Sequence, residues 1–125
     1  MTNPDTPTSD QVKEFTHRGY DCTVLMGPFT INGYIDLPDN HPWLQTDPTI
    51  NPNIDVHGGI TYHQGRVIGF DTNHFTDSYH PESKLYKLNI AHGCPIPPGH
   101  VWSWEEVTEE TKRLAEQARE AEQDN

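Results

Sequence analysis

Apolar residues recur in short alternating runs through the first part of the chain, which is the pattern of half-buried β-strands. The alternation extends over residues 20–26 and resumes over residues 29–37, after a Gly-Pro break at Gly27. Asn32-Gly33 is a second turn signal and lies inside the later run. The pattern therefore predicts an antiparallel pair of strands and leaves open which of the two signals closes it.

A second antiparallel pair is predicted further along the chain. Residues 59–63 and 66–72 both alternate, and Gln64-Gly65 between them matches a two-residue hairpin turn. Residues 84–90 also have the composition of a strand, with apolar side chains distributed along their length. We expect these segments to belong to the same sheet as the first pair.

The connection between the two pairs is unusually long. Residues 38–56 contain four prolines and little periodicity. A connection of this length inside a domain is uncommon unless it is functional or packed locally. Trp43 and Leu44 are the side chains expected to hold it against the core.

The clearest predicted element is an amphipathic helix over residues 104–121. Ser103 followed by Glu106 is a capping box, which marks the start of a helix. One stripe of the helix recurs at alternating spacings of three and four residues. Its members are Trp104, Val107, Thr111, Leu114 and Ala118.

Together these elements predict an α+β fold, in which one C-terminal helix packs on an antiparallel sheet of about four to five short strands. The length of 125 residues suits one domain. We place that domain at residues 12–121, after a disordered tail at residues 1–11 and before a frayed end at residues 122–125.

Charge and hydropathy exclude several classes of function. The chain has 8 Lys and Arg against 19 Asp and Glu, a formal net charge of -11, which argues against direct binding to nucleic acid or to an anionic membrane surface. No apolar run approaches the roughly 20 residues of a membrane-spanning helix, and the first ten residues lack the parts of a signal peptide. We therefore expect a soluble, cytoplasmic protein.

Side chains suited to metal binding or proton transfer lie on both sides of the second hairpin. Asp71, His74, Asp77 and His80 follow one strand at three-residue spacing, and His57 precedes the other strand. Because the hairpin pairs these strands, we expect His57 and His74 to be neighbours. An Asp-Thr-Asn sequence is also common in turns that bond their own backbone, so the pattern permits a structural interpretation as well.

Two adjacent glycines precede the first strand of this hairpin. Such a pair permits positive φ or a close approach of the backbone to a ligand, and it also suits a plain bulge or turn. The predicted ligand-binding residues are His57, Gly58, Gly59, Asp71, His74 and Asp77.

The same residues allow a second chemistry. Imidazole and carboxylate groups are ligands of Zn, Mn and Fe(II), so His57, Asp71, His74 and Asp77 are candidate metal ligands for a divalent cofactor. A histidine oriented by an aspartate can also act as acid or base. No compact metalloprotease motif such as H-E-x-x-H is present, and the sequence assigns no catalytic residue.

The motifs VHGGITY, GFDTNHFTD and EEVTEETKRLAEQ carry a family resemblance. They are similar to those of a group of small phage and bacterial proteins, often actinobacterial, that share V-H-G-G-[I/L]-T, G-F-D-x-x-H-x-x-D and an acidic helix ending in L-A-x-Q. The similarity covers roughly residues 15–120. It implies a phage or bacterial context, supplies no activity, and favours the six predicted binding residues as a unit that excludes His80.

Three hypotheses of function follow. The first is a protein that binds a small polar ligand, with a nucleotide-like molecule as one candidate, and that interferes with the host if it is phage-encoded. The second is a metal-dependent hydrolase. The third is an acidic module that inhibits a host protein and uses the two acidic ends of the chain as its surface; neutralising four helix glutamates, Glu105, Glu106, Glu109 and Glu110, would test it.

Overall fold

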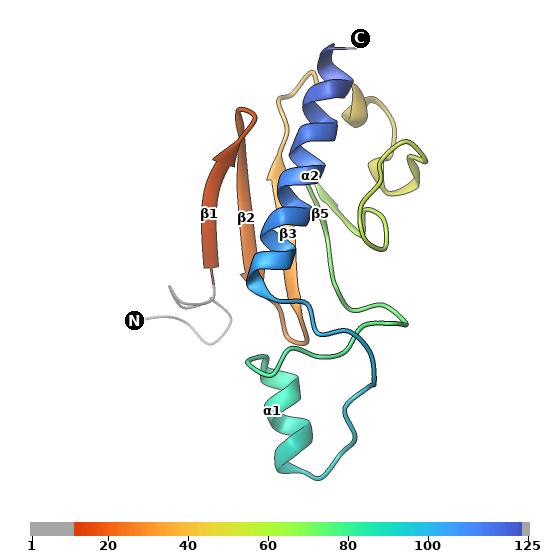
Figure 1. The fold of residues 1–125 in the computed structure, drawn as a ribbon. Coiled ribbons are helices and arrows are strands. Elements are labelled where there is room, and N and C mark those ends of the chain that lie inside the picture. Colours follow the sequence, from red (N-terminus) through yellow and green to blue (C-terminus); the bar gives the residue numbers. More distant parts are fainter. Residues whose placement is uncertain (1–11, 124–125) are drawn as a thin grey trace.

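The computed structural model describes residues 12–123, so the tail predicted at residues 1–11 lies outside it. Five antiparallel strands form one sheet in the order β1-β2-β3-β5-β4, and α2 lies across one face of that sheet (Figure 1). The strands are β1 (Val12–His17), β2 (Tyr20–Met26), β3 (Ile31–Asp36), β4 (Tyr62–Gln64) and β5 (Val67–Phe70). The helices are α1 (Lys84–Ala91) and α2 (Trp104–Gln123), with short 3-10 helices η2 (Pro42–Gln45) and η3 (Pro48–Ile50). The predicted α+β fold is confirmed.

The Gly-Pro signal closes the first pair of strands. Gly27 donates its backbone N–H to the carbonyl of Thr30 at 2.8 Å, and β3 begins at the next residue. Gly33 therefore lies inside a strand, where a Cβ atom would sit 2.1 Å from Thr111 Oγ1 of α2. This glycine serves the close packing of helix on sheet rather than a turn.

The second hairpin turns one residue later than the sequence predicts. Gln64 pairs with Val67, so Gly65 and Arg66 are the two turn residues. The paired strands, 62–64 and 67–70, are also shorter than the predicted 59–63 and 66–72. The segments beyond the ladder become loops, and they carry the candidate site.

Residues 84–91 form a helix, so the strand predicted over 84–90 is wrong. Ser83 is fully buried and caps the helix, because its hydroxyl accepts the N–H of Tyr86 at 3.2 Å. No residue of α1 is buried. The apolar side chains that indicated a half-buried strand therefore belong to an exposed helix.

The long connection is packed through a buried histidine. Nδ1 of His41 accepts the N–H of Trp43 at 3.0 Å, and Nε2 donates to the carbonyl of Ala118 on α2 at 2.8 Å. Trp43 is buried, and Leu44 packs against the core, as predicted. Residues 38–56 are thus anchored to α2 through η2, which lies beside that helix.

The capping box of α2 is confirmed by both of its reciprocal bonds. Glu106 N–H donates to Ser103 Oγ at 3.1 Å, and Ser103 N–H donates to Glu106 Oε1 at 3.0 Å. The buried stripe includes every predicted member except Trp104, which is only partly buried: Val107, Thr108, Thr111, Leu114, Ala115 and Ala118. Helix α2 continues to Gln123, two residues past the predicted end. No helix within residues 12–123 has the length and apolar character needed to cross a membrane.

Candidate functional site

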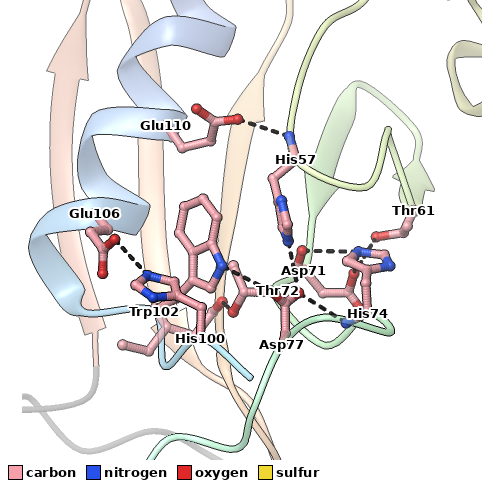
Figure 2. A network of polar contacts seen from close by, with 11 residues as sticks. His57, Thr61, Asp71, Thr72, His74, Asp77, His100, Trp102, Glu106 and Glu110 are labelled. Atoms are coloured by element: carbon pink, nitrogen blue, oxygen red, sulfur yellow. Dashed lines mark hydrogen bonds and ion pairs between the residues drawn. The ribbon is translucent and has the colours of Figure 1, made fainter. Parts of the chain in front are cut away.

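A buried aspartate joins three segments that are distant in sequence (Figure 2). The Asp77 side chain is 1% exposed. Its Oδ2 accepts Nε2–H of His57 at 2.7 Å and the backbone N–H of His74 at 3.0 Å, and its Oδ1 accepts Nε1–H of Trp102 at 3.0 Å. A buried carboxylate is tolerated when several donors compensate for the loss of water. Asp77 therefore fixes the relative positions of the loops that meet here.

A short parallel bridge brings Trp102 to this carboxylate. His100 donates its backbone N–H to the carbonyl of Thr76 at 3.0 Å and accepts the N–H of Ser78 at 2.8 Å. The segment that leads into α2 is thereby held beside residues 76–78. The indole N–H of Trp102, which lies in this segment, therefore reaches the Asp77 carboxylate.

His57 is held through both its backbone and its ring. Its N–H donates to Glu110 Oε2 on α2 at 2.8 Å. The imidazole packs against Trp102, with ring centroids 4.4 Å apart and planes inclined by 40°. Because the carboxylate of Asp77 only accepts hydrogen bonds, the proton of a neutral His57 ring lies on Nε2, and Nδ1 is left as the acceptor.

The loop before His57 is tied to α2 by a set of polar contacts. Gln117 accepts the N–H of Asp55 at 2.8 Å and donates to its carbonyl at 2.7 Å. Arg113 bonds to Asp55 and to Glu110. Burial alone would raise the pKa of the Glu110 carboxyl, but the hydrogen bonds from Arg113 and from the His57 backbone bring that pKa below its usual value. Glu110 thus remains an anion that holds His57.

His74 forms a second imidazole–carboxylate pair beside the first. Its Nε2 lies 2.7 Å from Asp71 Oδ1, and the same carboxylate also receives a long bond of 3.4 Å from Thr61. The His57 and His74 rings meet edge to face, with centroids 5.3 Å apart. The proximity predicted for these two histidines is confirmed.

The two glycines have different roles. Gly58 has φ of +69°, and a Cβ atom on it would lie 2.1 Å from His74 Nε2. Glycine at position 58 therefore allows the His74 ring to lie directly against the backbone. Gly59 also has positive φ, +78°, but a Cβ there would meet nothing within 4 Å, so its role is conformational.

His80 lies apart from this cluster, despite the three-residue spacing. Its backbone N–H donates to Phe29 beside the β2–β3 turn, and its Nδ1 accepts the N–H of Glu82. Burial lowers the pKa of the His80 imidazole. These hydrogen bonds fix the position of the segment that leads to α1.

Sequence reasoning missed Trp102 and Glu110 as parts of the site. Both are specified by tertiary contact, since they lie 45 and 53 residues from His57. The proximity of the predicted histidines followed from hairpin pairing, but no local motif connects this hairpin to the start of α2. The position of Trp102, immediately before the capping box, was a weak sequence signal that this residue belongs to the site.

The candidate metal ligands are arranged as two His–Asp pairs. Within residues 12–123, no three His, Cys, Asp or Glu side chains are grouped so that they could hold one metal ion. What the arrangement provides is two imidazoles whose tautomers are set by carboxylates and whose rings are 24% and 29% exposed. Such groups can accept hydrogen bonds from a ligand or exchange protons with it.

Comparisons of the chain with protein-family models, with curated proteins and with solved structures found no match.

Proposed function

We propose that the protein binds a small, planar polar molecule at the exposed edges of His57 and His74. The observation that carries this proposal is the pair of partly exposed imidazoles, each held through Nε2 by a carboxylate. Within the described residues, Nδ1 of neither ring has a hydrogen-bond partner. Two acceptors of fixed orientation therefore remain available to donors on a ligand.

The charge around the site limits the ligand. Asp77 and Asp71 pair with the two imidazoles, and Glu110 accepts the backbone N–H of His57. Among the ion pairs of the described residues, both imidazoles pair with carboxylates, and Arg113 pairs with Glu110 and Asp55. A phosphate group would be repelled by these carboxylates. The nucleotide-like ligand expected from the sequence is thus narrowed to a neutral or cationic molecule with N–H or O–H donors, such as a nucleoside or an amine.

An exposed aromatic residue adjacent in sequence to His74 favours a planar ligand. Phe75 directly follows His74 and is 99% exposed. An aromatic ring in this position can stack on a flat ligand whose donors face the imidazoles. Because Phe75 buries no surface in the free protein, removing its ring should change the affinity for the ligand without changing the stability of the fold.

The metal-dependent hydrolase has less support than ligand binding. A metal ion would have to displace the hydrogen bonds that pair the four candidate ligands. The acidic inhibitor module is also weakened, because three of the four helix glutamates make contacts within the chain, one of them the 3.5 Å ion pair of Glu109 with Lys112. Glu106 caps α2, and Glu110 holds His57.

The proposal is tested by thermal-shift and calorimetric titration with nucleosides, nucleotides, sugars and polyamines. We expect at least one nucleoside or amine to stabilise the protein, and the phosphorylated form of a bound nucleoside to bind more weakly. Binding should be lost in His57→Gln and His74→Gln. It should persist in His63→Gln, since His63 lies on exposed β4 away from the site.

Phe75→Ala is the most discriminating variant. It should weaken binding and leave the melting temperature of the free protein unchanged, because the replaced ring is fully exposed. If no compound in the panel binds, or if binding is the same in the His57, His74 and Phe75 variants, the proposal is wrong.

A further inference from the structure

Helix α1 stands apart from the core of the molecule. It lies beyond the N-terminal end of α2, away from the sheet (Figure 1). Among the described elements it forms no substantial contact with another helix or strand, and none of its residues is buried. Leu88 and Ile90 are 41% and 57% exposed. A helix in water normally buries one face, so this one has a face without a partner inside the chain.

The arm that carries α1 is nevertheless held by a hydrogen bond to the β2–β3 turn and by hydrogen bonds within the arm. Leu85 donates its N–H to the carbonyl of Pro28 at 3.0 Å, and Asn89 donates to the carbonyl of Pro95 at 3.3 Å. The hydroxyl of Ser78 donates to the carbonyl of Pro97 at 2.6 Å. A surface ordered in advance loses less conformational entropy when it binds a partner.

The exposed side of α1 is basic and apolar, in contrast to the rest of the chain. Lys84, Lys87, Leu88 and Ala91 are exposed and occupy positions i, i+3, i+4 and i+7, so they form one stripe of the helix. Neither lysine forms an ion pair within residues 12–123. On a chain with a formal charge of -11, this stripe suits a partner surface that is acidic and contains an apolar ring.

Such a surface is present on α2 of the same protein. An open groove of about 550 Å³ runs along this helix and is lined by Trp102, by five glutamates and by two basic residues, Lys112 and Arg113. The acidic side chains outnumber the basic ones, so the groove is acidic overall. Glu105 and Glu109 are exposed there. Glu105 has no partner in residues 12–123, and Glu109 has only a 3.5 Å contact with Lys112. The groove and the α1 stripe are thus complementary in charge, and each offers an apolar group to the other.

We propose that two copies of this chain associate by reciprocal contact, with α1 of each copy lying in the α2 groove of the other. The two contacts are equivalent, which is the arrangement of a closed two-fold dimer. Lys84 and Lys87 of one copy face Glu105 and Glu109 of its partner, and Leu88 lies against Trp102. The groove shares Trp102 and Glu110 with the candidate site, but the dimer contact uses neither imidazole, so the proposal does not depend on the function proposed above.

A charge-swap experiment tests the reciprocal contact, with mass measured by sedimentation equilibrium across a concentration series. The wild type should be a dimer whose dissociation constant increases with salt. Lys84→Glu with Lys87→Glu, and separately Glu105→Lys with Glu109→Lys, should each weaken association more than roughly tenfold. An equimolar mixture of these two variants should restore the dimer, because each reversed α1 then meets a reversed groove.

A matched control addresses net charge. Lys13→Glu with Arg18→Glu changes the formal charge by the same amount as Lys84→Glu with Lys87→Glu, at exposed positions near the N-terminus, and this variant should remain a dimer. Circular dichroism should show that all the variants are folded, because every substituted side chain is on the surface. A wild type that is monomeric at all concentrations overturns the proposal. A dimer that persists in both charge-swap variants, or a mixture that stays monomeric, overturns it as well.

Discussion

The contact between Gly58 and His74 allows a sharp comparison of two neighbouring glycines. Gly58 and Gly59 have nearly the same backbone conformation, with φ of +69° and +78°. They differ in what a side chain would meet: a Cβ atom at Gly58 overlaps the His74 ring, whereas one at Gly59 is in open space. Alanine at each position therefore separates the cost of positive φ from the cost of displacing His74.

The expected magnitudes follow from these contacts. Alanine in the left-handed region costs about 1–2 kcal/mol, partly offset by the lower entropy of the unfolded chain. We expect a net loss of about 1 kcal/mol for Gly59→Ala. Gly58→Ala also forces His74 away from Asp71, which lies 2.7 Å from its Nε2. A lost hydrogen bond to a charged group adds about 2 kcal/mol.

Urea unfolding followed by tryptophan fluorescence measures both losses. A double-mutant cycle identifies the cause, because in the His74→Ala background the clash at Gly58 no longer exists. There, Gly58→Ala should cost about as much as Gly59→Ala, which gives a coupling of about 2 kcal/mol. Equal destabilisation by the two single substitutions, or a cycle without coupling, would refute the placement of His74 against Gly58.

Three further substitutions test other parts of the structure. Asp77→Asn should lower the free energy of unfolding by about 2–3 kcal/mol in urea. The amide has only one accepting oxygen, so a buried donor such as Trp102 Nε1–H loses its partner. A change below about 0.5 kcal/mol would contradict the buried network. His41→Ala should cost about 3 kcal/mol, because two hydrogen bonds and buried volume are lost, while His63→Ala on exposed β4 serves as the near-neutral control. The pKa of Glu106 is lowered, first by the backbone N–H of Ser103, so its contribution to stability is present above its ordinary value of 4.5 and is lost as the pH falls below that value. Glu106→Gln should therefore reduce the loss of stability measured between neutral and acidic pH, and an unchanged acid dependence would exclude this contribution.

Local signals predicted the elements that depend on neighbouring residues. The capping box and the stripe of α2 are both specified within one helix, so the sequence located its start correctly. The role of Gly33 could not be predicted from neighbouring residues. Its missing side chain leaves room for Thr111 of α2, which lies almost eighty residues later in the sequence. The helical state of residues 84–91 depends on the buried cap at Ser83, and the apolar spacing alone did not reveal it.

The candidate site shows the same division. Hairpin pairing was enough to bring His57 and His74 together, because that proximity depends on one short loop. The partners Trp102 and Glu110 come from the start of α2, and only the packing of that helix on the sheet brings them to His57. Asp77 follows the Asp-Thr-Asn-His turn and joins it to other segments through a buried network of hydrogen bonds. The burial of Asp77 likewise depends on tertiary structure.

The central claim is that the Nδ1 atoms of His57 and His74 are acceptors for a donor-bearing ligand. It is tested most directly by nitrogen-15 NMR of the imidazole rings, recorded before and after addition of the nucleoside and amine pools. In the free protein, both rings should show the tautomer protonated at Nε2. A binding compound should shift the Nδ1 signals of both rings and leave those of His63 unchanged. Rings protonated at Nδ1 in the free protein, or Nδ1 signals that no pool shifts, would contradict the claim.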